Sequence, residues 1–503
     1  MEKTERCVNA VLIAALLAYA GLFLYHAARL ALYPYAIDYG EGFILHEAIE
    51  LAHLRNPYQP AETPPWLVSN YPPVYPAAVA AGVAIFGVQF HFGRCLSIVG
   101  ILVAGFCLFR MVRYQTEDRY CSWVAALFWI GCYPVYNWGS HHRVDSLGIG
   151  LEALGLLFVI RRNHLRLAIV FFLLALYTRQ TLWMGPIAGY LYLRRIDGPR
   201  DAAKWIGTLL LSGGALFGLL TLLTGGEFFK HIVLLNVNKY HFKDVWVYFH
   251  NVVMSLMVVS FICMLYHILK SAATKRWDLA AYCMVLSVLT FLLSGKSGSA
   301  TNYLFELGFA SAWATGLVLA ECRVLLQASS PFRALVPMFL AAMTLFPVHL
   351  PHLYGKWEIL DWGGTPNRRS HRRTGLLVDN LRETPGPIFS QDSGVALMSG
   401  HDLVWQPFIM RQLVESGRVD PSEFHQMIRD KKFNAVVLPF DMEMDPEKWN
   451  TEAYWTQFSN ELGRLIDENY RLVPANRPET WKLDRRYRGY FSPFQTNYLY
   501  RPR

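Results

Sequence analysis

The sequence predicts a mainly α-helical membrane protein: a polytopic helix bundle of about 11–12 spans followed by a small C-terminal α/β soluble domain. Of the 503 residues, 53% are hydrophobic and only 17% are charged, and the mean hydropathy is +0.22, which is too apolar for an ordinary soluble protein. Nearly all long apolar runs fall within residues 1–350, whereas charged residues and prolines interrupt short apolar runs from about Lys356 onward. We therefore expect a transmembrane domain over 1–350 and one soluble domain over 351–503.

The membrane spans follow from the lengths of the apolar runs, since a helix crossing hydrocarbon needs roughly 17–25 residues. The first run is too long for a signal-peptide core and has no clear small-residue cleavage site, so we interpret it as an uncleaved anchor. The short seventh candidate should form a hairpin with the sixth around Arg179. The candidates are 10–33, 74–90, 93–112, 120–138, 145–160, 165–178, 181–193, 205–223, 247–269, 279–294, 303–321 and 332–350.

The orientation is predicted from Lys and Arg in short loops, which are enriched on the cytoplasmic side. The basic residues that would be cytoplasmic are Lys3, Arg6, Arg110, Arg113, Arg119, Arg161, Arg162, Arg166, Arg194, Arg195, Arg200, Lys204, Lys270, Lys275, Arg276, Arg323 and Arg333. The outer side then carries an acidic outer loop (34–73), the loop 224–246 and the whole C-terminal domain. Loops of this kind also account for the net charge of +9, so we expect no nucleic-acid partner.

The crossing number of the segment 74–112 decides whether Asp38 and Asp145 face the same side. Both face outward only if this segment crosses an odd number of times, yet it contains two apolar runs. We favour a half-span or interfacial helix for one of them, because the basic loops after Arg110 and after Arg161 both support that interpretation. The alternative places Asp145 on the inner side.

Shorter elements are predicted outside the bundle. Apolar residues at helical spacing over 43–54 indicate an amphipathic helix at the membrane interface. In the soluble domain we expect strands at 387–390, 435–439, 470–473 and 498–500, and helices at 392–398, 408–415 and 421–430, as in a small α/β sandwich. This domain contains neither a P-loop nor a GxGxxG motif.

The eight cysteines all precede the soluble domain and include no CxxC pair. We interpret them as small apolar packing residues, and we expect neither a metal cluster nor a disulfide framework.

Two clusters of polar residues stand at the outer ends of the first half of the bundle. Asp38, with Tyr39 and Glu41, follows the first apolar run; these acids either end a span in solvent or form a functional site, because carboxylates at this depth are costly. The segment 138–146 carries the second cluster. In it Asp145 suits a helix N-cap paired with Arg143, or else Arg143 or the histidines, including His142, bind an anionic headgroup.

Two further clusters carry cations. Arg179 lies between two short spans, where it needs an anionic partner such as phosphate or a water-filled cavity. In the Gly-rich turn 294–306, backbone N–H groups and Lys296 suit a phosphate, although the spacing is not that of a Walker A loop. The alternative without a binding role is that Lys296 lies in a flexible loop and extends its side chain to solvent. A divalent metal between Asp38, Glu41 and Asp145 is chemically reasonable but no ligand spacing demands it, so we expect no cofactor.

Together these motifs resemble the glycosyltransferase superfamily with the C-type fold, which includes protein O-mannosyltransferases and the lipid A aminoarabinose transferase. The similarity is greatest to bacterial members that use polyprenyl-phosphate sugars, and it covers most of the chain. The motifs are Asp38-x-x-Glu41, Asn56-Pro57-Tyr58, Tyr71-Pro72-Pro73-Val74-Tyr75-Pro76, Arg143-x-Asp145, Arg179-Gln180, Gly295-Lys296-x-Gly298 through Asn302-Tyr303, Ser390-Gln391-Asp392-Ser393 and Trp405-Gln406-Pro407-Phe408.

The resemblance implies an inverting transfer of a sugar from a polyprenyl-phosphate donor to a hydroxyl of a cell-envelope glycan, lipid or protein acceptor. Asp38 would be the catalytic base, and Glu41 would orient it or contact the acceptor. One or more of Lys296, Arg179 and Arg143 would stabilise the departing phosphate. The remaining residues expected at the cavity or the acceptor are Tyr39, Tyr71, His142, Asp145, Asn302 and Tyr303.

The implied location is the inner (plasma) membrane, with domain 1–350 catalytic and the C-terminal domain extracytoplasmic. Two alternatives remain open: an oligosaccharide ligase or polymerase that uses a polyprenyl-diphosphate donor, and a flippase or transporter of lipid-linked sugars. Transporters commonly show paired broken helices in two related halves, whereas this chain has an acidic first outer loop and a single appended soluble domain.

Overall fold

The computed structural model describes residues 2–236, 238–325, 366, 368–439, 459–473 and 497–503. It is 71% helical with a small four-stranded sheet near the C-terminus, so the predicted fold class is confirmed. The expected span 332–350 and the expected domain boundary at 350/351 lie outside the described residues.

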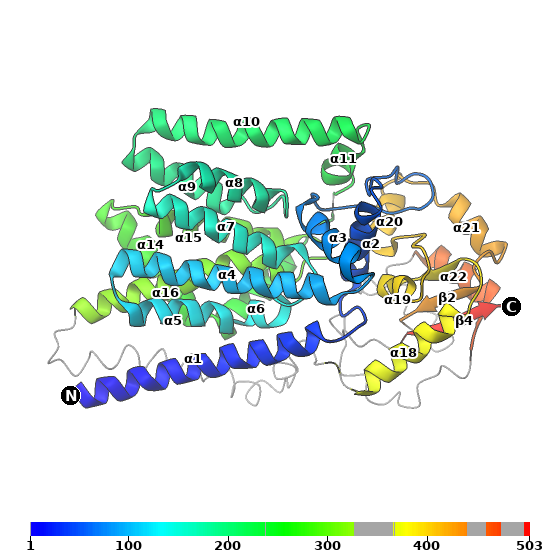
Figure 1. Cartoon of the computed structure of the whole chain (residues 1–503), viewed down its shortest axis with the longest axis horizontal. Helices are drawn as coiled ribbons and strands as arrows, with labels where there is room; N and C mark the ends of the chain where they lie inside the picture. The colour runs from blue at the N-terminus through cyan, green and yellow to red at the C-terminus, as the bar shows by residue number, and fades with distance from the viewer. Residues whose placement is uncertain (1, 237, 326–365, 367, 440–458, 474–496) are drawn as a thin grey trace.

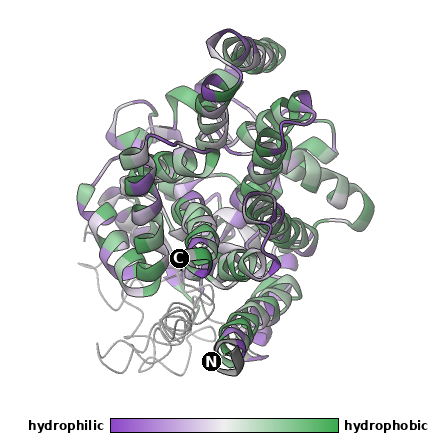
Figure 2. Ribbon diagram, turned by 90° about the vertical axis from the view of Figure 1, so that its left-hand side faces the viewer, coloured by the Kyte–Doolittle hydropathy of each residue, from purple (hydrophilic) through white to green (hydrophobic). Residues whose placement is uncertain are grey.

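The helix bundle fills one half of the molecule, and its long helices run side by side along the longest axis (Figure 1). Seen along the bundle, these helices are dominated by hydrophobic residues (Figure 2). The bundle consists of α1 (Glu2–Ala31), α4 (His91–Thr116), α5 (Arg119–Gly131), α6 (Tyr133–Trp138), α7 (Val144–Arg161), α8 (Leu165–Leu176), α9 (Met184–Ile196), α10 (Pro199–Leu223), α14 (Val258–Thr274), α15 (Leu279–Phe291) and α16 (Phe305–Leu325).

Burial separates the central helices of the bundle from its periphery. In the most apolar stretch of the span that includes α16, 94% of the residues are buried inside the protein, whereas in that of α10 only 6% are. Leu211, Leu222 and Leu223 of α10 are largely exposed. Because exposed leucines on an apolar helix are stable in hydrocarbon rather than in water, α10 has the surface of a lipid-facing helix.

Four described helices are long and apolar enough to cross a membrane: Arg6–Ala31, His91–Thr116, Pro199–Leu223 and Thr301–Val324. The bent pair Phe242–Leu256 and Val258–Thr274, with an angle of 98°, would make a fifth. Several other predicted spans are shorter helices, such as α8 with 12 residues. Such a helix extends only about 18 Å, which is less than the roughly 30 Å thickness of the hydrocarbon.

The segment 74–112 contains one short helix and one long helix. The short one, α3 (Val74–Phe86), has 13 residues, whereas α4 has 26. Asp38 and Arg143, which lie on either side of this segment in sequence, form an ion pair. The geometry therefore agrees with the half-span interpretation, in which α3 does not cross and Asp38 and Asp145 share one end of the bundle.

The outer loop contains one long helix, α2 (Tyr39–Ala52), which starts four residues earlier than predicted. It starts there because Asp38 is its N-cap, with Oδ2 accepting a hydrogen bond from the Gly40 N–H at 2.9 Å. Residues Gly40 to Leu45, with Glu47 and Ala48, are buried, since α2 packs between α3 and the C-terminal domain (Figure 1). The helix that was expected at the membrane interface is thus present, and it is largely buried between protein elements.

The remaining outer elements form two groups that are short and irregular. The first group follows α10 and leads into α14, and the second joins α15 to α16. They are α11 (Glu227–Phe229), η1 (Lys230–Leu234), α12 (Phe242–Tyr248), η2 (Phe249–Val253), α13 (Met254–Leu256), η3 (Leu292–Gly295) and η4 (Thr301–Leu304).

The C-terminal domain has one mixed sheet with strand order β1-β2-β4-β3. β1 and β2 pair in parallel, with Phe389 opposite Val436, and β4 pairs antiparallel with both β2 and β3. All four strands and the three expected helices are present within one or two residues of the prediction. The elements are α18 (Arg368–Arg382), β1 (Ile388–Ser390), α19 (Ser393–Met398), α20 (Pro407–Glu415), α21 (Ser422–Arg429), β2 (Ala435–Leu438), α22 (Asn460–Asn469), β3 (Tyr470–Leu472) and β4 (Tyr498–Pro502).

The C-terminal domain and the outer loop share a hydrophobic core. Trp66 of the outer loop is 1% exposed and lies edge-on to Trp405 at 5.5 Å between ring centroids. Its N–H donates to the Val404 carbonyl at 3.0 Å, and its carbonyl accepts from the Gln406 N–H at 3.0 Å. The soluble domain is therefore built onto the outer loop at the end of the bundle where the candidate site lies.

Candidate functional site

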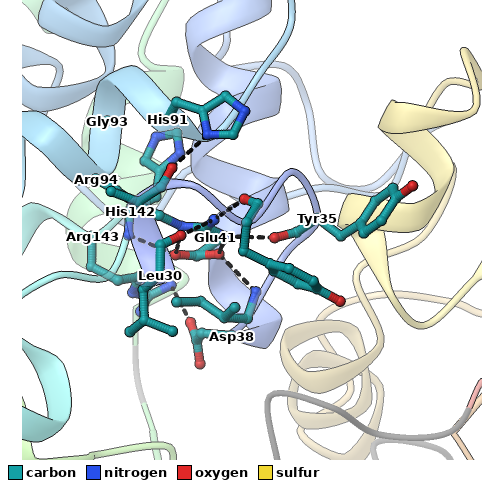
Figure 3. Close-up of polar contacts among 12 residues, drawn as sticks. Leu30, Tyr35, Asp38, Glu41, His91, Gly93, Arg94, His142 and Arg143 are labelled. Carbon is teal, nitrogen blue, oxygen red and sulfur yellow. Dashed lines mark hydrogen bonds and ion pairs between the residues drawn. The ribbon is translucent and has the colours of Figure 1, made fainter. Parts of the chain in front are cut away.

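Asp38 lies where the outer loop meets the bundle. Its Oδ2 accepts from the Gly40 N–H and lies 3.5 Å from the Nη1 atom of Arg143 (Figure 3). The side chain is 13% exposed, so its carboxylate is neither fully buried nor fully solvated. A carboxylate in this position keeps free lone pairs with which it can accept a proton from a second group.

Arg143 extends from the start of α7 toward Asp38. Its Nη2 donates to the Tyr71 hydroxyl at 3.2 Å, and its Nε is buried with no hydrogen-bond partner among the described residues. Gly40 permits this approach, because a Cβ built there would lie 1.4 Å from Nη1. The guanidinium thus has a remaining donor, which is what a phosphate oxygen requires.

Glu41 is fully buried against Arg94, whose Nη2 lies 2.6 Å from its Oε2 (Figure 3). The two carboxylate oxygens also accept from the backbone N–H groups of Ile37 at 2.9 Å and His142 at 2.7 Å. Burial alone would raise the pKa of Glu41, but the charge of Arg94 outweighs it and lowers the pKa to about 2. Of the two roles expected for Glu41, its surroundings fit orientation of the Asp38 segment and leave no contact surface for an acceptor.

The sequence reasoning missed Arg94. This residue of α4 is 0% exposed and donates to the backbone carbonyls of Leu30, Tyr33 and Tyr35 in addition to Glu41. It was hidden because it lies in a run interpreted only as an apolar span. The available signal was the charge itself, since a lone arginine in an apolar helix needs a partner.

Asp145 pairs with Arg179 and not with Arg143. The Arg179 Nη1 atom lies 2.6 Å from the Asp145 Oδ1 atom, with both side chains buried. Asp145 also accepts from Asn302 Nδ2 at 2.9 Å and from the Trp138 indole at 3.0 Å, and the Tyr303 ring lies 4.4 Å from the guanidinium. The expected N-cap is also different: Arg143 occupies that position and Asp145 lies in the first turn of α7.

Lys296 is half-buried in the turn that follows η3. Its side chain has no hydrogen bond or ion pair with any residue that the structure describes. The turn reaches the Asp38 region through Phe408, since a Cβ on Gly298 would touch the Phe408 ring at 2.7 Å and the Phe408 N–H donates to the Tyr39 hydroxyl at 3.1 Å. Lys296 therefore adds a cation, with no anionic partner among the described residues, on the same side of the bundle as Asp38.

His142 lies in the protein interior and does not supply a cation. Its ring is 0% exposed and lies 5.6 Å from Tyr75 and 5.8 Å from Phe90. Burial lowers its pKa to about 3, so the imidazole is neutral at physiological pH. Neutral His142 cannot pair electrostatically with an anionic headgroup; its observed contribution is the backbone N–H that Glu41 accepts.

Glu47 is another buried carboxyl, and it was not among the expected site residues. Glu47 lies on a buried face of α2, where it is 5% exposed, and it is near Ser69 and Arg143. Burial raises its pKa to about 8, against the smaller opposing effects of the Ser69 hydrogen bond and the Arg143 charge.

The three carboxylates considered as metal ligands do not converge. Asp38, Glu41 and Asp145 each have an arginine partner, and the described part of the chain contains no group of three His, Cys, Asp or Glu side chains placed to hold a metal ion. The expectation of no cofactor stays a prediction.

Comparisons with known proteins give structural matches only. The sequence matches no protein-family model and no curated protein. It is similar to the structure of ArnT from Cupriavidus metallidurans in the apo state, with a TM-score of 0.58 and 12% identity over 84% of this chain and 92% of that chain. The same protein bound to undecaprenyl phosphate gives a TM-score of 0.56 with the same identity and coverage.

A third structure is the Archaeoglobus fulgidus oligosaccharyltransferase in complex with Zn and sulfate. It gives a TM-score of 0.49 and 14% identity over 92% of this chain and 71% of that chain. At 12% identity the likeness to ArnT shows the fold alone. The chain therefore has the fold of ArnT, which is the C-type fold that the motif resemblance predicted.

Proposed function

We propose that the chain is an integral membrane glycosyltransferase that moves a sugar from a polyprenyl-phosphate donor to a hydroxyl of a cell-envelope glycan, lipid or protein acceptor. The observation that carries this proposal is the pairing of a partly exposed carboxylate, Asp38, with an arginine that has a spare buried donor, Arg143. The pair lies at the outer end of a bundle with the fold of ArnT, a protein known in complex with undecaprenyl phosphate.

The reaction is a single displacement with inversion at the anomeric carbon. Asp38 takes the proton of the acceptor hydroxyl, the acceptor oxygen bonds to the anomeric carbon, and the bond from that carbon to the phosphate oxygen breaks. The leaving group is a polyprenyl phosphate, which needs no general acid when cations stabilise it. Glu41 keeps the segment that carries Asp38 in place.

The charges at the site suit an incoming phosphate. Asp145 already neutralises Arg179, and Asp38 lies at a looser 3.5 Å from Arg143. Lys296 has no anionic partner within the described residues. Arg143 and Lys296 are therefore the cations that we assign to the donor phosphate, and Arg179 with Asp145, Asn302 and Tyr303 supports the wall beside them.

The same proposal places the protein in the inner membrane with the C-terminal domain on the extracytoplasmic side. Lipid-linked sugars would then reach the site from the bilayer. The acceptor would approach between the outer loop and the C-terminal domain, where Tyr39 and Phe408 meet.

The test replaces Asp38 with Asn in cells that lack the native gene. Asn caps a helix as well as Asp does, so α2 should form normally while the base is lost. We expect the transferred sugar, measured by mass spectrometry of cell-envelope glycans, to fall about 100-fold or more.

Asp118→Asn is the matched control, because Asp118 also caps a helix and pairs with an arginine, at 3.1 Å from Arg323. It lies at the opposite end of α5 from the site, so its glycan profile should match that of the native protein. Near-normal transfer by D38N would remove Asp38 as the base.

A further inference from the structure

Asn70 and Gln180 adjoin residues of the site in sequence, and no role has been assigned to their side chains. Asn70 precedes Tyr71, which contacts Arg143, and Gln180 follows Arg179. The Gln180 Nε2 atom donates to the backbone carbonyl of Asn70 at 2.9 Å. Asn236 Nδ2 donates to the same carbonyl at 3.3 Å, so one backbone oxygen joins three segments of the outer surface of the bundle.

Both amides leave an oxygen without a partner. Asn70 Oδ1 and Gln180 Oε1 are buried, and neither accepts a hydrogen bond from any described residue. The orientation of Gln180 is fixed, because its nitrogen must face the Asn70 carbonyl and its oxygen must then point elsewhere. A buried acceptor left unpaired costs about 1–3 kcal/mol, so a donor belongs at this position in the functioning protein.

The chemistry of this position suits the hydroxyl groups of a sugar. The two residues are partly exposed although their amide oxygens are buried, and carbonyl oxygens accept from hydroxyls without carrying charge. Tyr71 and Tyr58 lie next to the amides, the Tyr58 hydroxyl donating to the Tyr71 carbonyl at 2.9 Å. Asn70 precedes Tyr71, whose hydroxyl accepts from Arg143, and Gln180 follows Arg179, so two neutral amides adjoin the cationic residues of the site in sequence.

We propose that Asn70 and Gln180 form the subsite for the donor sugar, with Asn70 Oδ1 and Gln180 Oε1 accepting hydrogen bonds from its hydroxyl groups while Arg143 and Lys296 hold the adjacent phosphate. The inference rests on the proposed function and deepens it. It assigns the recognition of the sugar to neutral hydrogen bonding, separate from the recognition of the lipid phosphate.

The experiment compares two kinds of lipid on the purified full-length protein in nanodiscs. One is undecaprenyl phosphate, and the other is a panel of undecaprenyl phosphates that carry glucose, mannose or aminoarabinose. The native protein should bind at least one sugar-bearing lipid more tightly than the bare lipid. Asn70→Ala and Gln180→Ala should each reduce that preference about threefold to tenfold, the size expected for one neutral hydrogen bond, with the Kd of the bare lipid within twofold of native.

Asn236→Ala is the matched control. It loses a hydrogen bond to the Asn70 carbonyl, as Gln180→Ala does, but its oxygen is not among the buried atoms without a partner in the described part of the chain, so the preference should be retained. Asn70→Ala is the cleanest variant, because the bonds that join the three segments use the backbone of Asn70 and survive the substitution.

Several results would overturn the subsite. The first is a native protein that binds no sugar-bearing lipid more tightly than the bare lipid. The second is an unchanged preference in both variants, which would leave an ordered water as the partner. The third is an equal loss of affinity for the sugar-bearing and the bare lipids. A raised KM for the acceptor with an unchanged donor preference would also overturn it, since the amides would then bind the acceptor. Failure of the proposed function looks different: the native protein would not bind undecaprenyl phosphate, or Lys296→Ala and D38N would change neither binding nor transfer.

Discussion

Three carboxylates at the outer end of the bundle each face a different arginine, and their surroundings separate their roles. Glu41 and Asp145 are buried and accept several hydrogen bonds at 2.6–3.1 Å. Asp38 is partly exposed and has its arginine at 3.5 Å. A proton acceptor must be reachable by its substrate and must not be saturated by other donors, and among the three only Asp38 meets both conditions.

Glu47 gives a pH dependence of stability that can be measured. Its pKa is about 8 in the folded protein against an ordinary value of 4.5, so the folded state holds this proton more tightly than the unfolded state does. Its contribution to stability is therefore fully present below about pH 4.5 and is lost as the pH rises toward 8, by about 1.4 kcal/mol per unit. We expect the unfolding temperature of the purified protein to fall over this range, and Glu47→Gln to reduce that fall.

The exposed Glu62 of the same outer loop supplies the control. Glu62→Gln should leave the pH dependence of unfolding as it is in the native protein. A pH dependence that is identical in the native protein and in Glu47→Gln would show that Glu47 is not buried as the structure has it.

The sequence identified most of the charged residues that meet at the site, because each lies at the end of an apolar run where charge is costly. The sequence did not predict which of these charges pair with each other. Arg143 and Asp145 are two residues apart and were expected to pair, but the turn into α7 directs Arg143 to Asp38 and Asp145 to Arg179. Such choices depend on how α7 packs against α4 and α8, which no local pattern encodes.

At the scale of elements, the link between α1 and α2 is fixed by one side chain. Arg94 of α4 donates to the carbonyls of Leu30, Tyr33 and Tyr35 and to Glu41 (Figure 3). These acceptors span the end of α1 and the start of α2, so Arg94 ties the segment that carries Asp38 to α4. An arginine can do this because its planar group directs five donors at once.

Arg94→Lys should therefore impair catalysis through Asp38. Lysine keeps the buried charge opposite Glu41 but cannot reach the carbonyls together, so Asp38 should lose its fixed position. We expect kcat to fall about tenfold to 100-fold with the affinity for undecaprenyl phosphate unchanged.

The double variant separates positioning from general damage. If Arg94 acts through Asp38, Arg94→Lys should lower the residual transfer of D38N no further. An equal loss in the native and D38N backgrounds would contradict the positioning role and indicate a loss of folded protein.

Element prediction succeeded where local chemistry decides and failed where packing decides. The strand β2 is four apolar residues, Ala435–Leu438, buried on both faces, and such a run is recognisable by itself. The membrane helices share their apolar character whether they are full spans or short pieces, as the contrast between α3 and α4 shows. The apolar pattern alone therefore does not give the length of each helix.

At the scale of the whole molecule, the soluble domain is part of the site. Its residue Phe408 contacts both the Tyr39 hydroxyl, next to Asp38, and Gly298, in the turn that carries Lys296. A residue from outside the bundle therefore contacts both the segment that carries the proposed base and the turn that carries the proposed phosphate cation. Phe408 can hold them only if the domain is firmly seated on the outer loop, and the shared core around Trp66 provides that seating.

Trp66→Ala should loosen the whole domain and reduce transfer with it. Removing a fully buried indole costs about 3–5 kcal/mol, and here the loss falls on the core that joins Trp405 and Phe424 to the outer loop. We expect a lower unfolding temperature, faster release of the C-terminal domain by limited proteolysis, and a fall in kcat. Trp246, which is 59% exposed, is the control, and Trp246→Ala should change none of the three. A W66A protein that keeps native turnover while its domain is released would show that the bundle alone aligns Asp38 with Lys296.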